Sequence, residues 1–227
     1  PPATGPAVLA EKTSFGDFPG DILVLSGDVP LIPERTLNAI ICGHRQGNAS
    51  LTLLTTSLEE PRGYGRVLRD ADGNIAGIVE DQDATDAQQQ IDEINAGIYV
   101  AFAPFLFSAL EKVKNHNEQG EYYLPDTVAI ALDQGKRVAT VKAEDPREVM
   151  GINTREELAQ MEKTLQERIN RKWMDNGVTL RDPNTIYIDS DVVIGRDTVI
   201  GPNTQLRGNT VIGERCQIDG SAFLTDV

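Results

Sequence analysis

Aliphatic residues recur at every sixth position through the C-terminal part of the chain. The seven positions are Ile188, Ile194, Ile200, Leu206, Ile212, Ile218 and Leu224. Four residues after each of the first six stands a small side chain: Val192, Thr198, Thr204, Thr210, Cys216 and Ala222. A six-residue period is typical of a parallel β-helix, in which three hexads make one triangular coil with the aliphatic side chains inside. Ordinary strands would repeat every two residues instead.

The hexads therefore predict a parallel β-helix over residues 178–227. The chain contains little more than two such coils. An open last coil would expose apolar interior and unpaired strand edges. We therefore expect a cap or further coils to follow residue 227 in an intact protein.

The first two thirds of the chain carry a different pattern, in which short apolar runs alternate with helical stripes. Residues 22–25 and 51–55 are continuous aliphatic runs of the kind found in strands buried on both faces. Further strands are expected at 66–80 (a pair around a turn), 97–102 and 137–142, with helices at 33–43 and 104–114. This alternation predicts an α/β domain with a largely parallel sheet over residues 1–153.

A long helix is predicted between these two parts, over residues 154–177. Thr154 and Glu157 form a capping box at its start, and Asn176-Gly177 supplies its end. Its apolar stripe is made of Leu158, Met161, Leu165, Ile169 and Trp173. We interpret this helix as the connector between the domains and its stripe as a packing face.

Composition narrows the classes of partner. The 227 residues carry a net charge of −14, which argues against binding to nucleic acid or anionic membranes because nothing offsets phosphate repulsion. A small phosphorylated ligand stays compatible with this charge. Cys42 and Cys216 fit no metal-ligand spacing and are expected to be reduced thiols of a cytoplasmic protein. No apolar run reaches membrane-spanning length.

Asp28 is the first candidate for chemistry. It follows the predicted strand at 22–25, and ligands of open parallel sheets gather at the carboxyl ends of strands. A carboxylate there suits a hard cation such as Mg²⁺, although an Asp turn that bonds its own backbone is an equal alternative. Asn153 is a second possible oxygen ligand, with a place in the N-cap region of the long helix as its alternative.

Three further positions are candidates for binding a ligand. The segment Gly63-Tyr64-Gly65-Arg66 either brings backbone amides against a ligand or is a flexible loop entering a strand. Glu80 and Asn95, at predicted strand ends, either hold sugar hydroxyls or are solvated. None of these signals is specific alone.

Their order along the chain is specific. The motifs are Gly27-Asp28-Val29-Pro30-Leu31-Ile32, Gly63-Tyr64-Gly65-Arg66-Val67, Gly77-Ile78-Val79-Glu80, Glu93-Ile94-Asn95-Ala96-Gly97-Ile98, Gly120-Glu121-Tyr122-Tyr123-Leu124 and Gly151-Ile152-Asn153. With the hexads, this order resembles the bacterial bifunctional N-acetylglucosamine-1-phosphate uridyltransferase family of the GlmU type. The resemblance implies a Rossmann-like nucleotidyltransferase domain, a connecting helix and a left-handed β-helix, in that order. It also implies truncation at both ends, since the family's glycine-rich phosphate loop would precede residue 1 and its acetyltransferase site would follow residue 227.

The resemblance implies a reaction and a set of site residues. Family members transfer UMP from UTP to N-acetylglucosamine 1-phosphate with Mg²⁺, and their β-helix acetylates glucosamine 1-phosphate from acetyl-CoA, commonly in a homotrimer. By matching motif, Asp28 (also the catalytic candidate) and Asn153 are the expected Mg²⁺ ligands. Gly65, Glu80 and Asn95 are the expected sugar-binding set, and Thr4 is the expected nucleotide contact. Asn153 is an expected substrate contact as well as a metal ligand.

The sequence departs from the family pattern in places. Ala3 and Pro6 replace a Gly and a His around Thr4, and Pro125 stands where many relatives carry a Thr. Without the phosphate loop, residues 1–227 alone are expected to be inactive. Two alternatives stay open: another sugar-nucleotide pyrophosphorylase, or an inactive module that only trimerises.

Overall fold

A computed structural model describes residues 4–113 and 123–227 of the chain. Ala3 and Gly120–Tyr122, which belong to two of the predicted motifs, lie outside the described residues. The chain forms two compact units, Pro1–Gly151 and Ile152–Val227. The long helix groups with the hexads in the second unit, and the border between the units falls just before the predicted domain limit at residue 153.

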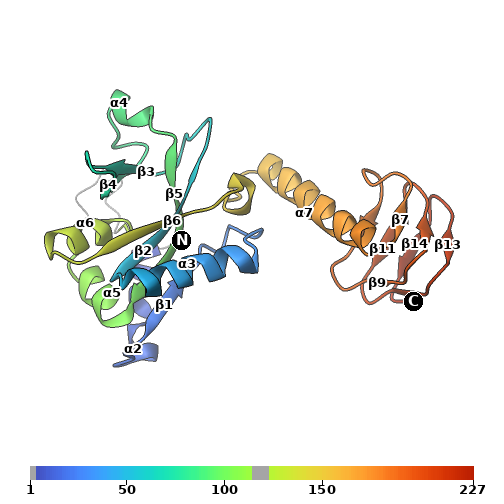
Figure 1. The fold of residues 1–227 in the computed structure, drawn as a ribbon, viewed down its shortest axis with the longest axis horizontal. Helices are drawn as coiled ribbons and strands as arrows, with labels where there is room; N and C mark the ends of the chain where they lie inside the picture. The colour runs from blue at the N-terminus through green and yellow to red at the C-terminus, as the bar shows by residue number, and fades with distance from the viewer. Residues whose placement is uncertain (1–3, 114–122) are drawn as a thin grey trace. The chain divides into compact units, whose positions relative to one another are not determined.

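The first unit alternates strands and helices (Figure 1). Its strands are β1 (Asp21–Val24), β2 (Leu51–Ser57), β3 (Arg66–Arg69), β4 (Ile75–Val79), β5 (Glu93–Phe102) and β6 (Val138–Lys142). Its helices are α1 (Thr4–Ala10), α2 (Lys12–Phe15), α3 (Glu34–Gly47), α4 (Asp86–Gln89), α5 (Ala103–Leu110), α6 (Asp126–Asp133) and the 3₁₀ turn η1 (Pro146–Glu148). The predicted α/β character is thus confirmed.

The sheet is mixed, so the prediction of a largely parallel sheet is wrong. Its order is β4-β3-β5-β2-β6, with β1 paired to β5. Within this sheet only the described strands β2 and β6 pair in parallel, because β5 runs opposite to its neighbours β1, β2 and β3, and β3 runs opposite to β4. A continuous apolar run reports burial on both faces, which an antiparallel strand under two helix layers also has.

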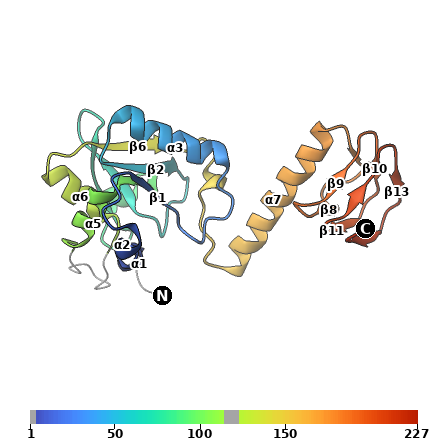
Figure 2. The same ribbon diagram turned by 90° about the horizontal axis from the view of Figure 1, so that it is seen from below.

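Helices cover both faces of this sheet, as Figure 2 shows. Helix α3 packs its buried Ile40 on one face, in a cluster with Leu54, Ile98 and Val100. Helices α5 and α6 pack on the other face, where a larger apolar cluster forms around Leu106 and their other buried side chains. Burial on both sides fixes the sheet, so loops at its edge can carry polar groups at defined positions.

The second unit begins with α7 (Arg155–Asp175) and continues in short strands. These are β7 (Thr179–Leu180), β8 (Tyr187–Ile188), β9 (Val193–Ile194), β10 (Val199–Ile200), β11 (Gln205–Arg207), β12 (Val211–Ile212), β13 (Gln217–Ile218) and β14 (Phe223–Thr225). All their pairings are parallel, and partners such as Ile200 and Ile218 stand three hexads apart. The predicted coil of three hexads is therefore confirmed.

The hexad aliphatics and the small residues both face the coil interior. Ile200 and Leu206 are fully buried, and so are Thr198, Thr204 and Thr210. Buried hydroxyls need partners. The Thr198 hydroxyl donates to the Gly213 carbonyl oxygen at 2.7 Å and accepts from the Cys216 N–H at 3.1 Å, whereas the Thr204 hydroxyl has no partner within the described chain.

Helix α7 starts and ends as predicted. Thr154 and Glu157 form a complete capping box, and Gly177 beyond its end has φ +90°. Its buried Asn170 side chain donates to the carbonyl oxygens of Pro183 and Ile186 at 2.7 and 2.9 Å, which anchors the helix on the coils. No helix within the described ranges combines the length and apolar character needed to cross a membrane.

The two buried threonines give a matched pair of substitutions. Thr198→Val should lower the free energy of unfolding of the second unit by about 1–3 kcal/mol, because it leaves two backbone groups unpaired. Thr204→Val should leave it unchanged or raise it, because it removes a hydroxyl that has no partner. Urea unfolding of the whole chain measures both, and equal losses in the two variants would contradict this account.

Candidate functional site

Asp28 lies in a tight turn directly after β1. The Val29 N–H donates to the Ser26 carbonyl oxygen at 3.4 Å, so the Asp28 side chain stands at the tip of the turn, exposed. Among the described residues its carboxylate makes no hydrogen bond and no ion pair. The alternative of an Asp turn bonded to its own backbone is therefore not what the structure has, and both carboxylate oxygens are available.

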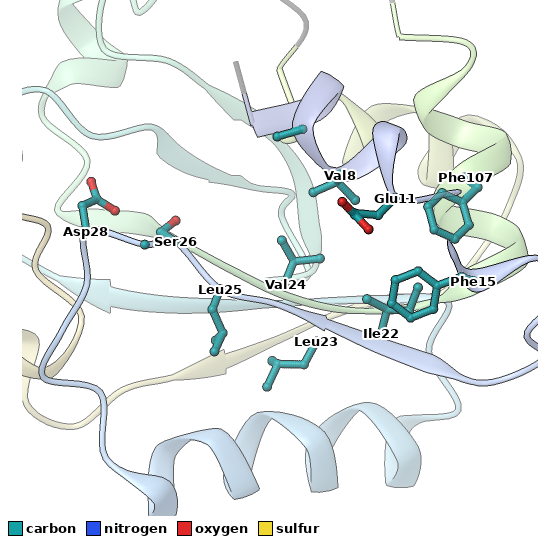
Figure 3. A pocket seen from close by; sticks show the side chains of 12 residues that line it. Val8, Glu11, Phe15, Ile22, Leu23, Val24, Leu25, Ser26, Asp28 and Phe107 are labelled. Atoms are coloured by element: carbon teal, nitrogen blue, oxygen red, sulfur yellow. The ribbon is translucent and has the colours of Figure 1, made fainter. Parts of the chain in front are cut away.

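An open pocket of about 560 Å³ runs along β1 to this turn. Figure 3 shows Phe15 and Phe107 at one end, Val8 and Val24 between, and Asp28 at the other end. The pocket thus joins an apolar wall to a free carboxylate, a combination common in small-molecule sites.

A bulge in β5 connects this turn to the centre of the sheet. Leu53 pairs with Tyr99 and Thr55 with Asn95, so two steps along β2 face four along β5. Within the bulge Gly97 has φ +72°, and its carbonyl oxygen accepts a hydrogen bond from the Ser26 hydroxyl at 3.1 Å. A Cβ atom at position 97 would lie 2.8 Å from that hydroxyl oxygen. The turn and the bulge are therefore held against each other.

Asn95 is buried inside β5 rather than at a strand end, which corrects the expected position. Its side-chain oxygen accepts from the Gly97 N–H at 3.1 Å, and its side-chain nitrogen donates to the Tyr99 hydroxyl at 2.6 Å. Its backbone N–H donates to the Gly65 carbonyl oxygen at 2.8 Å. One predicted site residue thus binds another directly.

Glu80, which follows β4, completes this group. A Cβ atom at Gly65 would lie 3.0 Å from a Glu80 carboxylate oxygen, so the absence of a side chain at Gly65 leaves room for that carboxylate. No described residue donates a hydrogen bond to it. Burial, and next the negative charges of Asp126, Asp83 and Asp81, raise the pKa of Glu80. An underbonded, half-buried acceptor of this kind can bind ligand hydroxyls.

The Gly63–Arg66 segment is held in place by Asp81. The Gly63 N–H donates to one Asp81 carboxylate oxygen at 2.8 Å, and the buried Arg66 guanidinium donates to the other at 2.7 Å. The guanidinium also donates to the Tyr64 carbonyl oxygen. These bonds favour a fixed loop over the flexible loop that was the alternative.

The structure therefore brings Gly65, Glu80 and Asn95 into one cluster, which we call the carboxylate cluster. The cluster is linked to the turn that carries Asp28 through Gly97, which bonds both Asn95 and Ser26. Their roles as ligand contacts stay predictions.

Asn153 and Thr4, the other two predicted site residues, belong to other parts of the chain. Asn153 belongs to the second unit, so its pairing with Asp28 stays a prediction. Its backbone N–H donates to Glu157 at 2.6 Å, and its side chain is exposed. Thr4 begins α1. Within the described ranges no three His, Cys, Asp or Glu residues group to hold a metal.

Sequence reasoning missed three residues of this region: Ser26, Asp81 and Tyr99. In a regular strand, residues four apart are about 13 Å from each other, so nothing in the sequence pairs Tyr99 with Asn95. A glycine inside a strand pattern often marks a bulge, and Gly97 was the one available signal.

The chain was compared with known families and proteins. A family model described as "Nucleotidyl transferase" matches residues 1–180, and one described as "Bacterial transferase hexapeptide (six repeats)" matches residues 191–226. The bifunctional protein GlmU of Geobacter metallireducens is 47% identical over 97% of this chain and 46% of its own length. That of Listeria innocua is 47% identical over 99% of this chain and 49% of its own length.

The chain thus spans about half the length of the relatives it matches, and the predicted resemblance to GlmU proteins is confirmed. A solved structure of UDP-glucose pyrophosphorylase with UDP-glucose covers 74% of this chain, and the chain covers 63% of it, with a TM-score of 0.58 and 14% identity. At that identity the likeness concerns the fold, and it agrees with the predicted α/β nucleotidyltransferase architecture.

Gly97→Ala should damage the site and the first unit together. The alanine would have to adopt a left-handed backbone conformation, and its Cβ would come too close to Ser26. Both effects together should lower the free energy of unfolding by about 1–3 kcal/mol. Gly77→Ala in β4 is the matched control, since its Cβ would meet open space. Urea unfolding of the whole chain compares the two variants. If Gly97→Ala is as stable as the control, the bulge does not need the left-handed conformation at residue 97.

Glu80→Gln should stabilise the unliganded chain at pH 7. Because the fold raises the pKa of Glu80, the stability this residue contributes is complete below its unfolded pKa near 4.3 and is lost as pH rises through the folded pKa. The variant removes the ionised form. Thermal unfolding at pH 7 and about pH 4.5 should show an advantage that shrinks at the lower pH, and a variant less stable than wild type at pH 7 would contradict the sign.

Proposed function

Because the chain belongs to the nucleotidyl transferase family, we propose that its first unit transfers UMP from UTP to N-acetylglucosamine 1-phosphate, giving UDP-N-acetylglucosamine and pyrophosphate. One observation carries the proposal: Gly65, Glu80 and Asn95, far apart in sequence, form one cluster tied to the Asp28 turn. Identity near 47% with bifunctional GlmU proteins supports the choice of substrates.

The carboxylate cluster would hold the sugar. The Glu80 carboxylate accepts no hydrogen bond from the residues that the structure describes, and such an acceptor suits a sugar hydroxyl. After its bonds to described residues, the Asn95 side chain has one N–H and one lone pair left. Gly65 leaves space beside the carboxylate. A sugar that cannot hydrogen-bond these polar groups would bury them unpaired and would therefore bind more weakly. This difference in affinity supplies selectivity between sugars.

The proposed reaction is an in-line displacement. A phosphate oxygen of the sugar phosphate forms a bond to the α-phosphorus of UTP, and the bond from that phosphorus to the bridging oxygen breaks, so pyrophosphate leaves with the electron pair. No covalent intermediate with the protein is needed, so the residues act mainly by positioning. Glu80 and Asn95 would fix the sugar and thereby orient its phosphate.

Asp28 and Asn153 would hold Mg²⁺, and Thr4 would contact the nucleotide. Enzymes of this family generally use a divalent metal. The Asp28 carboxylate is exposed and unpaired within the described residues, and the Asn153 side chain is exposed; oxygen donors of these two types fit Mg²⁺. The ion supplies charge neutralisation on the phosphates when bound.

We further propose the domain roles and the assembly. Residues 1–153 would be the nucleotidyltransferase domain, 154–177 the connector and 178–227 the first coils of a left-handed β-helix. Coils beyond residue 227 would acetylate glucosamine 1-phosphate from acetyl-CoA. Val193 and Val211, adjacent on β9 and β12, are 53% and 62% exposed, and this outward apolar column supports packing into a homotrimer. The substrates suit a cytoplasmic protein.

Pyrophosphate release by the intact protein, assayed with four nucleoside triphosphates and several sugar phosphates, tests the proposal. UTP with N-acetylglucosamine 1-phosphate should be the preferred pair. Preference for another pair would identify a different sugar-nucleotide pyrophosphorylase. Absence of turnover, together with no Mg²⁺-dependent heat on titration with UDP-N-acetylglucosamine, would leave a module that only assembles.

Asp28→Ala in the intact protein should reduce kcat/KM at least about 100-fold, since metal-held charge stabilisation contributes several kcal/mol and each 1.4 kcal/mol is tenfold. Asp17→Ala is the matched control, because that residue is also exposed but precedes β1. Near-normal turnover of Asp28→Ala would remove Asp28 from the metal site.

A further inference from the structure

Tyr99 carries a hydroxyl group inside the apolar core. The residue is 1% exposed and belongs to the cluster that packs α5 and α6 on the sheet. A buried hydroxyl without a partner is costly, so such groups are hydrogen-bonded. The Tyr99 hydroxyl oxygen accepts a hydrogen bond from the Asn95 side-chain nitrogen at 2.6 Å.

The surroundings of Asn95 determine which way its carboxamide faces. The Gly97 backbone N–H can only donate, so the atom it meets at 3.1 Å must be the Asn95 oxygen. The nitrogen therefore faces Tyr99, whose oxygen accepts its hydrogen. Both ends of the carboxamide are fixed from inside the strand, and one N–H and one lone pair are not used by any described residue.

The two residues meet because of the β5 bulge. Four residues of regular strand would separate them by about 13 Å. The bulge takes up two extra residues between them, with Gly97 in a left-handed conformation. The contact is thus built by the same backbone feature that binds Ser26.

We propose that Tyr99 is a positioning residue for sugar binding: its hydroxyl locks the Asn95 carboxamide in the orientation that the sugar phosphate meets. This inference rests on the proposed function, since it assigns Tyr99 an effect on the same sugar site. Tyr99→Phe would keep the packing of the ring and remove the hydrogen bond that orients the Asn95 carboxamide.

The phenol is suited to this task because it keeps its proton. Burial, and to a smaller degree the charges of Glu80 and Asp126, raise the pKa of Tyr99. A neutral hydroxyl accepts from Asn95 and retains an O–H to donate, with the Glu80 and Asp126 carboxylates as its charged neighbours. Tyr99 therefore also lies in the electrostatic field of the carboxylate cluster.

The test is Tyr99→Phe in the intact protein, with steady-state kinetics for both substrates. The substitution removes the hydrogen bond that holds the Asn95 side-chain nitrogen and leaves that nitrogen unpaired. This loss should raise KM for N-acetylglucosamine 1-phosphate about 3- to 10-fold. KM for UTP and kcat should change less than about twofold. Tyr187→Phe, on an exposed tyrosine of β8 in the second unit, is the matched control.

A double-mutant cycle separates positioning from a merely structural effect. If Tyr99 acts through Asn95, Tyr99→Phe should have no further effect on KM in an Asn95→Ala background. The side-chain amide resonances of Asn95 in ¹⁵N-labelled protein should also shift in Tyr99→Phe, a readout that needs no turnover.

The outcomes distinguish the two proposals. A wild-type protein without turnover on any sugar phosphate contradicts the proposed function and this inference with it. An active wild type with unchanged KM in Tyr99→Phe contradicts the inference alone. Additive effects of the two substitutions, or unshifted Asn95 amide resonances, overturn it as well.

Discussion

The candidate site depends on one backbone distortion, the bulge of β5 at Gly97. Strand β5 pairs with β1, β2 and β3, so its path sets the position of most of the sheet. A bulge interrupts the ladder of backbone hydrogen bonds and re-aims the side chains around it. Here side chains replace the missing backbone partners of Gly97. Its carbonyl oxygen accepts from the Ser26 hydroxyl, and its N–H donates to the Asn95 carboxamide oxygen. The distortion thus joins the turn that carries Asp28 to the cluster around Glu80.

Charge in the carboxylate cluster shows the balance between stability and binding. Glu80 is placed where burial and neighbouring carboxylates disfavour its ionised form. Asp81, one residue later, is instead paired with the buried Arg66 and with the Gly63 N–H. Adjacent carboxylates therefore have different roles: Asp81 holds the loop together, and Glu80 has no hydrogen-bond donor among the described residues. Strain of this kind is expected at ligand sites, because the ligand supplies the missing bonds.

The parts of the fold that the sequence predicts are those that depend on local repetition. The hexads predict the coils because each hexad aliphatic pairs with the aliphatic three hexads further along the chain. The capping box at Thr154 is equally local, since its two residues are three apart. Strand direction was not predictable from the run at 22–25, since burial on both faces is the same for either direction. Asp28, Gly65, Glu80 and Asn95 became candidates through motif order. Tyr99 was not, because its contact exists only when the backbone bulges.

Asn153 shows how a structural and a functional interpretation of one residue can both hold. The sequence left open whether it serves the start of the long helix or a metal ion. In the structure its backbone N–H serves the helix, by donating to Glu157 beside the Thr154 cap, while its side chain is exposed. Main chain and side chain are separate sets of donors and acceptors. A position can therefore begin a helix with one set and keep a carboxamide oxygen for a hard cation with the other, so a helix-cap signal in a sequence does not argue against a ligand at the same residue.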